Sequence, residues 1–385
     1  MSRASPVSKC ARRHRRGFAL PAAIIALVLL SVLVAGALFL STEELRAGRT
    51  DVAAQRALSA AEWGLDRTVA SWDAQLNTRL QIGDSRVLLE WGEGSDSVEV
   101  AALRVQEHAF WITSHATSGA DGRAIPARTT IGASMRLVVP RSAVRAALTA
   151  AGAVTVDGGT VDGGEMRAPA DATGVCAALA AVGVAGIIVP DSSRVCGASC
   201  TGSPVAGVFG APPVATDSSL ASDSTTLPGA REAFAARVSA SLPGGELSPA
   251  PVVVGNDCLR TSVLNWGDPT SGGPCADHYP VVHVRGDAVL AAGAVGQGVL
   301  LVDGTLQLGA GARFFGLVIV ANDVVVGEPG AEITGAVIAG DVDRGEGSRV
   351  AAGGAIRFAA CAVRRALLGA ARLTRTPDRW WAELR

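Results

Sequence analysis

The sequence Arg12-Arg13-His14-Arg15-Arg16-Gly17-Phe18-Ala19-Leu20-Pro21 opens an apolar run that continues to residue 40. Residues 18–40 contain no Asp, Glu, Lys or Arg. A helix needs roughly 20 apolar residues to cross the hydrocarbon core of a bilayer, so this segment is long enough to span a membrane. A secretory signal peptide has a shorter apolar core that ends in a small-residue cleavage site, and this run does not fit that pattern.

The charges before the run predict its orientation. Six basic and no acidic residues precede it, namely Arg3, Lys9, Arg12, Arg13, Arg15 and Arg16. The positive-inside rule keeps residues 1–17 in the cytoplasm and places the rest across the inner membrane. A plain signal anchor is one interpretation of this pattern.

A second interpretation is a resemblance. Arg16-Gly17-Phe18 before an apolar helix resembles the class III leader of type IV pilins and pseudopilins. Downstream, Glu43-Glu44-Leu45-Arg46-Ala47-Gly48-Arg49 and Arg56-Ala57-Leu58-Ser59-Ala60-Ala61-Glu62-Trp63-Gly64-Leu65 resemble the N-terminal region of PilX-like minor pilins. The resemblance covers about residues 12–70. It implies that a prepilin peptidase cuts between Gly17 and Phe18, and that the new N-terminal Phe18 is methylated.

One position departs from the pilin pattern. Most pilins have Glu at the fifth position after cleavage, where this chain has Ala22 after Pro21. That Glu is thought to neutralise the N-terminal amine of a neighbouring subunit, and a buried charge is costly unless it is paired. The absence of Glu is a hint of an initiating or tip subunit; drift at this position is the alternative.

The next part of the chain suits a pilin-type head. Residues 41–72 keep helical spacing of apolar residues without proline, which extends the predicted helix to residues 18–72. Four β-rich segments follow, at residues 86–91, 97–106, 109–118 and 128–139, separated by turn residues. We expect an antiparallel sheet packed on the helix, within a head of residues 73–140.

The C-terminal half contains a repeat. Gly298-Val-Leu-Leu-Val302-Asp-Gly, Gly316-Leu-Val-Ile-Val320-Ala-Asn-Asp and Gly335-Ala-Val-Ile-Ala339-Gly-Asp are one motif three times, 18 to 20 residues apart. Short apolar strands at such a period, broken by Gly and Asp, are typical of a β-solenoid, or β-helix. We predict this fold for residues 276–358, with first rungs in residues 141–167. An ordinary β-sandwich is the alternative.

The remaining segments are less clear. Residues 168–275 are rich in Gly, Pro and Ser and are expected to be a disulfide-pinned insertion beside the solenoid, with residues 201–227 as loop and a short helix over residues 230–240. Residues 359–373 have helical spacing, and residues 359–385 are expected to form a cap helix and a tail. The sequence does not decide whether the tail, with Trp380-Trp381, packs on the head.

Cysteine usage fits an exported chain. Cys10 belongs to the leader, and an even number remains outside the membrane, as Cys176, Cys196, Cys200, Cys258, Cys275 and Cys361. Close spacing favours Cys258 with Cys275, and a pairing within Cys176, Cys196 and Cys200. A zinc site at Cys196 and Cys200 is the rival interpretation, but no histidine is near, so we expect no metal and no cofactor.

Charge and motifs indicate a structural role. Without the six basic leader residues, 34 − 6 = 28 basic residues face 35 acidic ones, which gives no footprint for nucleic acid. His108 and His115 flank a strand, so surface positions are expected. Asp277-His278 and His283 stand where a β-helix enzyme keeps acid–base groups. No nucleophile, phosphate-loop or HExxH motif is present, and Asp-Gly pairs are expected to form turns. We expect no enzyme.

The sequence therefore predicts a mainly β protein with a long N-terminal helix: a pilin-like helix and antiparallel sheet, followed by a C-terminal β-solenoid. The expected function is that of a minor pilin or pseudopilin in filament initiation, tip assembly or adhesion. Its expected partners are the inner membrane, a prepilin peptidase and other pilins or pseudopilins, with an unidentified surface ligand. The head would be periplasmic, and extracellular in a pilus. The alternative is a signal-anchored β-solenoid that binds or cleaves polysaccharide.

Overall fold

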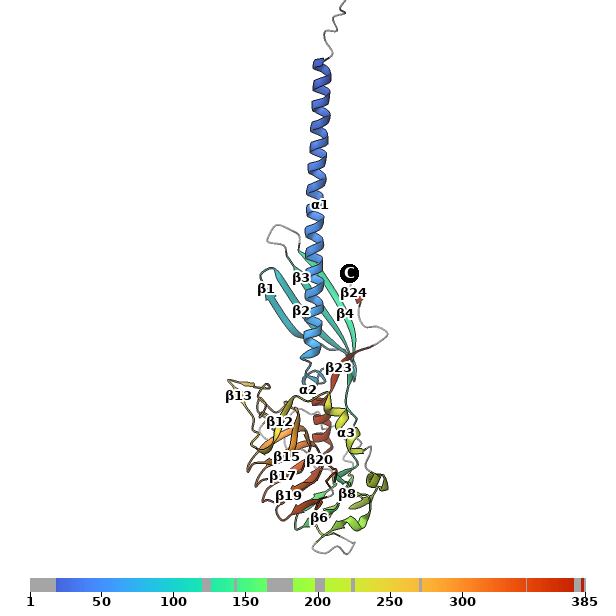
Figure 1. The fold of residues 1–385 in the computed structure, drawn as a ribbon, viewed down its shortest axis with the longest axis vertical. Helices are drawn as coiled ribbons and strands as arrows, with labels where there is room; N and C mark the ends of the chain where they lie inside the picture. Colours follow the sequence, from blue (N-terminus) through green and yellow to red (C-terminus); the bar gives the residue numbers. More distant parts are fainter. Residues whose placement is uncertain are drawn as a thin grey trace, which may run out of the picture.

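The computed structural model describes residues 19–119, 126–141, 144–164, 183–197, 205–222, 226–269, 272–343, 345–376 and 382–383. Helix α1 (Ala19–Ala70) projects far beyond the rest of the molecule (Figure 1). Its apolar side chains from Leu20 to Leu40 are exposed, and the helix contains a stretch long and apolar enough to cross a membrane. The prediction of one continuous helix over residues 18–72 is confirmed for residues 19–70, where α1 ends.

The second half of α1 packs on an antiparallel sheet, and together with the short helix α2 (Ala74–Asn77) they form the head. The first four strands of the sheet are β1 (Ser85–Glu93), β2 (Asp96–Gln106), β3 (Ala109–Ser118) and β4 (Ala127–Val138). Because side chains alternate along a strand, one face presents Val100, Ile112 and Met135 to Ala61 and Leu65 of α1. The four predicted strands are present, in antiparallel order.

The last strands of the chain complete the same sheet. β23 (Arg372–Arg375) and β24 (Ala382–Glu383) both pair with β4 in antiparallel fashion. Everything between β4 and β23 is therefore an insertion between two adjacent strands of the head. The sequence did not decide where the C-terminal tail packs, and β23 and β24 place it on the head. Trp380 and Trp381 lie outside the described residues.

The insertion contains a curled, mostly parallel sheet of 16 strands, which we call the parallel stack. Its strands before the crossing helix are β5 (Ala146–Ala150), β6 (Val154–Asp157), β7 (Thr160–Asp162), β8 (Ala185–Val189), β9 (Val195–Cys196), β10 (Val208–Phe209) and β11 (Val214–Thr216). Those after it are β12 (Ala240–Leu247), β15 (Val281–Leu290), β16 (Val295–Val302), β17 (Leu306–Leu308), β18 (Arg313–Val320), β19 (Val324–Val326), β20 (Glu332–Ala339), β21 (Ser348–Ala351) and β22 (Ala355–Phe358). Two 3-10 turns, η1 (Ser192–Arg194) and η2 (Ser218–Ser222), and the hairpin β13 (Val253–Val254) and β14 (Asp257–Cys258) lie beside it.

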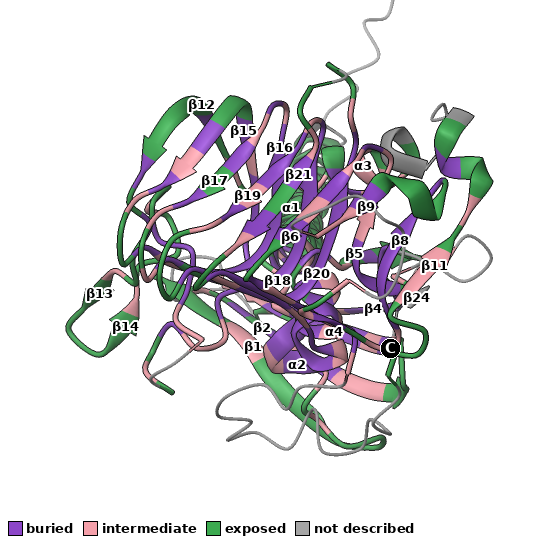
Figure 2. Ribbon diagram, turned by 90° about the horizontal axis from the view of Figure 1, so that it is seen from below, coloured by how far each residue is buried: buried purple, intermediate pink, exposed green. Residues whose placement is uncertain are grey.

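The order of strands in the parallel stack differs from their order in the chain. Neighbours along one column run β12, β15, β16, β18, β20, β5, β8 and β11, and Figure 2 shows this order across the stack. The chain enters at β5 in the middle, proceeds to β11 at one end, crosses to β12 at the other end, and returns until β20 lies against β5. Both ends of the insertion therefore leave from the middle of the stack.

Two helices cover one side of the stack. α3 (Thr226–Ala235) belongs to the crossing segment, and α4 (Ala360–Gly369) leads back to the head. Strands β16, β18 and β20 present one row of side chains, such as Val318, to the interior of the stack, and the alternate row, such as Leu317, to Phe234 of α3 and Ala366 of α4. Because both faces of these strands are buried, their second halves, residues 299–302, 317–320 and 336–339, are entirely apolar.

Two expectations need correction. Residues 168–275 are not simply an insertion beside the stack, since β8 to β11 and β12 are strands of the stack itself, and β10, β11 and η2 occupy part of the expected loop. Strands β8 to β11 are too short to show a hydrophobic period. The predicted cap helix, realised as α4, packs on the side of the stack and not over its end, because its apolar face fits the outer row of β16, β18 and β20.

The three repeats predicted from sequence pair in register. Gly298, Gly316 and Gly335 lie opposite one another on β16, β18 and β20, and their φ angles are 109°, 137° and 143°. A Cβ on Gly316 would lie 2.0 Å from the carbonyl oxygen of Gly298. This column of glycines lets successive strands approach where no side chain fits.

Replacing Gly316 by Ala should lower the free energy of unfolding by about 3 kcal/mol or more, because the methyl group clashes with backbone and the residue keeps a left-handed φ. Gly293 is the matched control: its φ is 72°, but no atom lies within 4 Å of its Cβ position. Gly293→Ala should cost only roughly 1–2 kcal/mol. Denaturant unfolding of both variants measures the difference, and equal losses would contradict the close stacking.

Candidate functional site

The surface of α1 is the first candidate site. Between the apolar segment and the head, α1 carries exposed acidic and basic side chains. The head covers only the face of the helix that includes Ala53, Ala57 and Ala61. Of these charges, Arg46 pairs with Glu43 at 2.9 Å, and Arg375 of β23 pairs with Asp66. The predicted cleavage and methylation site, Gly17 and Phe18, lies outside the described residues.

The joint between head and stack is a second cluster of charges. Asp277, in the loop before β15, accepts from Arg79 of the head and, at 2.9 Å, from Arg365 of α4. The Arg365 side chain is 9% exposed, and its guanidinium lies 4.9 Å from the centre of the Tyr279 ring. The Asp277 carboxylate thus accepts a charge-assisted hydrogen bond from each side of the joint, and these bonds hold the stack against the head.

Further contacts reinforce the joint. Gln75 of α2 donates to the carbonyl of Arg365, and Arg260 contacts Asp73 at 2.5 Å. Asp73 is also the N-cap of α2, accepting from the Leu76 backbone N–H. One short helix of the head is therefore bonded both to α4 and to the loop after β14.

The other acid–base candidates also have structural partners. The buried His278 ring bonds to the carbonyl oxygen of Asn265 at 3.1 Å. His283 bonds to Asp303 at 2.9 Å, and Asp303 also accepts from Arg231 of α3. His115 is exposed and bonds to Thr130. Within the described part of the chain, none of these residues belongs to a metal-binding group.

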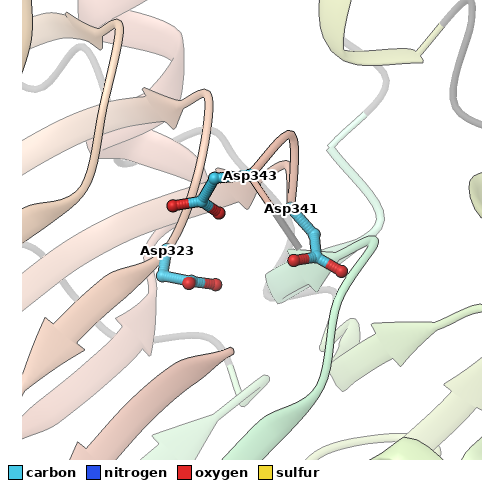
Figure 3. Close-up of side chains that lie close together, drawn as sticks. All are labelled: Asp323, Asp341 and Asp343. Carbon is cyan, nitrogen blue, oxygen red and sulfur yellow. The ribbon is translucent and has the colours of Figure 1, made fainter. Parts of the chain in front are cut away.

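The structure does gather three carboxylates that the sequence did not single out. Asp323, Asp341 and Asp343 have oxygen atoms within 4.8 Å of one another, at the turns that follow β18 and β20 (Figure 3). Burial raises the pKa of Asp323, and the carboxylates of Asp341 and Asp343 raise it further. Asp341 has a φ of 145°. The signal was the repeat itself, which places an aspartate at the same turn of successive strands.

Among the described residues, this cluster is the group that could hold a metal, since carboxylate oxygens are the ligands that Ca²⁺ prefers. Asp323 already accepts hydrogen bonds from the Gly347 backbone and the Ser348 hydroxyl. These two hydrogen bonds lower the pKa of Asp323, against the effect of its burial.

A small cavity of about 160 Å³ lies in the head where α1, α2 and β1 meet. Three side-chain atoms on its wall have no hydrogen-bond partner in the described part of the chain: Thr68 Oγ1, Trp72 Nε1 and Asn77 Oδ1. Buried polar groups that lack a protein partner are commonly satisfied by ordered water. The cavity is large enough for several water molecules, so these atoms fit a hydrated pocket.

Disulfides stiffen the stack. Cys258 and Cys275 are bonded, which ties the β13–β14 hairpin to the loop before β15. Cys196 and Cys361 each take part in a disulfide as well. Cys176 and Cys200 lie outside the described residues, so the pairing expected within Cys176, Cys196 and Cys200 stays a prediction. The zinc alternative at Cys196 loses this ligand to its disulfide.

Comparison with known proteins adds little. No protein-family model matches the chain, and no curated protein does. Among solved structures, the competence-associated pilin ComZ from Thermus thermophilus matches with 14% sequence identity and a TM-score of 0.22, covering 87% of this chain and 97% of that chain. A TM-score this low does not establish a shared fold, so the function must be argued from the residues of this chain.

The burial of His278 predicts a pH dependence. Burial, and then the charge of Arg260, lower the pKa of His278 to about 4, whereas the unfolded chain has a His pKa near 6.5. The stabilisation is present above pH 6.5 and is lost as the pH falls towards 4, by on the order of 3 kcal/mol. Unfolding of wild type and His278→Gln at pH 7 and pH 4.5 measures this. A pH dependence that is unchanged in the variant would contradict it.

Proposed function

We propose that this chain is a minor pilin or pseudopilin of a type IV pilus-like system. A prepilin peptidase would remove residues 1–17, and Phe18 would be methylated. The mature chain would be held in the inner membrane by α1, with its head and parallel stack in the periplasm, and outside the cell once assembled. Its role would be in filament initiation, tip assembly or adhesion.

The observation that carries the proposal is the placement of Gly17-Phe18 immediately before α1. This helix is exposed and apolar over its first half and packs on an antiparallel sheet over its second half. A plain signal anchor needs only the apolar half. A helix that also forms the spine of a folded head suits a subunit that assembles through it.

The stack extends the proposal. We infer that the parallel stack is a β-solenoid, because its strands repeat every 18 to 19 residues in register. It lies at the end of the molecule farthest from the membrane segment (Figure 1). A rigid, exposed unit in this position would present a surface to a ligand or to other minor pilins. The absence of Glu at Ala22 favours an initiating or tip position.

Co-expression with a prepilin peptidase should yield a mature chain that starts at Phe18, detected by N-terminal sequencing and mass spectrometry of the membrane fraction. Gly17→Leu should abolish this cleavage, because the peptidase cuts after that glycine. Gly36→Leu is the control, since Gly36 lies in the same helix with no atom within 4 Å of its Cβ position. An intact leader in wild type would overturn the proposal and leave a signal-anchored stack, to be tested for polysaccharide binding.

A further inference from the structure

The cavity in the head is lined by three elements that meet at one place. Thr68 belongs to the last turn of α1, Asn77 ends α2, and Trp72 lies in the link between the two helices. Leu76 of α2 and Val87 of β1 add apolar wall. The linked ends of two helices therefore supply three polar side chains to one cavity.

Two of these polar side chains are buried without a protein partner. Thr68 is 4% exposed and Asn77 is 3% exposed, and neither Thr68 Oγ1 nor Asn77 Oδ1 has a hydrogen-bond partner in the described part of the chain. Comparable groups nearby are satisfied: the hydroxyl of Thr50 on α1 donates to a backbone carbonyl, and so does the buried side chain of Gln75 on α2. Because an unpaired buried polar group costs free energy, a bound molecule would account for the arrangement.

The unpaired atoms specify a ligand that both donates and accepts hydrogen bonds. Trp72 Nε1 is a donor only, and among the described residues it has no acceptor. Asn77 Oδ1 is an acceptor, and the Thr68 hydroxyl can act in both ways. A hydroxyl group carries one donor and two acceptor lone pairs. Neighbouring hydroxyls of one ligand can therefore bond to all three atoms.

The charges in the wall oppose a charged ligand. The exposed guanidinium of Arg86 disfavours a cation, and the carboxylate of Asp73 disfavours an anion. Both oxygens of Asp73 are already bonded within the protein, Oδ1 to the backbone N–H of Leu76 at 2.9 Å and Oδ2 to Arg260. The wall therefore fits a neutral ligand that carries hydroxyl groups.

The volume of the cavity limits the size of the ligand. A protein cavity of about 150 Å³ holds benzene, a ring of six carbon atoms, and this cavity has about 160 Å³. A neutral six-membered ring with hydroxyl groups is a pyranose sugar, whose C–H groups can pack on Leu76, Val87 and Leu88. Ser71 and Arg86 are exposed lining residues, so the cavity opens to solvent there and further sugars of a glycan can extend outwards.

We propose that this cavity binds one pyranose residue of a glycan through Thr68, Trp72 and Asn77. The site belongs to the head, and it is separate from the surface of the parallel stack. The inference rests on the proposed function for placing the head outside the cytoplasm, and it names the chemical class of a ligand for that head.

Binding of free sugars tests the proposal. The full chain is reconstituted in phosphatidylcholine nanodiscs, and saturation-transfer NMR is recorded with glucose, galactose, mannose and N-acetylglucosamine, with empty nanodiscs as background. At least one sugar should bind, with a dissociation constant on the order of 1 mM for a ligand of this size. Binding of none of them would overturn the proposal and leave a cavity filled by water. Binding of N-methylacetamide but no sugar would also overturn it, in favour of an amide group from a protein partner.

Substitutions in the cavity locate the site. Thr68→Val and Asn77→Leu each remove a polar group and keep most of its volume, and each should weaken sugar binding about tenfold, as the loss of a hydrogen bond does. Thr50→Val is the matched control, because it removes a hydroxyl from the same helix outside the cavity, and it should bind like wild type. Wild-type affinity in either cavity variant would contradict the proposal.

Denaturant unfolding separates a ligand site from a structural role. Since Thr68 Oγ1 and Asn77 Oδ1 have no partner among the described residues, their removal should leave the free energy of unfolding unchanged or raise it. A loss of stability in both variants would mean that the two atoms support the fold through bound water, and would overturn the proposal. If either variant fails to fold, Trp72→Phe keeps an aromatic ring against Phe110 without the N–H group, and it should show the same loss of binding.

Failure of this inference can be told apart from failure of the proposed function. A leader that stays attached in the presence of the peptidase, with sugar bound, refutes the pilin-type subunit and leaves the cavity as a sugar site on a signal-anchored head. Removal of the leader without sugar binding leaves the pilin-type subunit in place and refutes only the ligand of the cavity.

Discussion

The pairing of β23 with β4 is the constraint on which the rest of the structure depends. It makes residues 139–371 an insertion between two neighbouring strands, so the insertion must begin and end at one place. A stack built by adding one turn of chain after another has its two ends at opposite ends of the stack. In this protein the first strand of the insertion, β5, lies in the middle of the stack. β20, near the end of the insertion, pairs with β5, so both ends of the insertion leave the stack from its middle. The crossing segment with α3 is the consequence, since it carries the chain from one end of the stack to the other.

The same constraint positions the functional parts. α4 leaves the stack beside β18 and lies against both α2 and the loop that holds Asp277, so the stack is bonded to the head at more than its two covalent connections. The head in turn is packed along α1. In a chain built in this way, the orientation of α1 fixes the orientation of the stack.

Local patterns account for what could be predicted from the sequence. The apolar run, the helical spacing to residue 70, the four strands of the head and the glycine repeat each depend on neighbouring residues, and each is found. The strands β8 to β11 could not be predicted, because two to five residues carry no period. No local pattern encodes contacts between residues far apart in the chain. Two such contacts are the pairing of residues 372–375 with β4 of the head and the pairing of β5 with β20. The carboxylate cluster at Asp323 required the register of the repeats.

The order of strands in the stack is the most direct test of this account. Thr155 of β6 and Arg349 of β21 are register partners on the outer surface, although they are far apart in the chain. The variant Thr155→Cys with Arg349→Cys should form a disulfide in the folded protein, detected by mass spectrometry of the non-reduced digest. Gln307→Cys with Val325→Cys, partners on β17 and β19, gives the yield expected for neighbouring strands. A similar yield of disulfide for residues 155 and 349 would support the pairing of β21, late in the insertion, with β6, near its start. No bond between residues 155 and 349, while the control pair forms one, would contradict it.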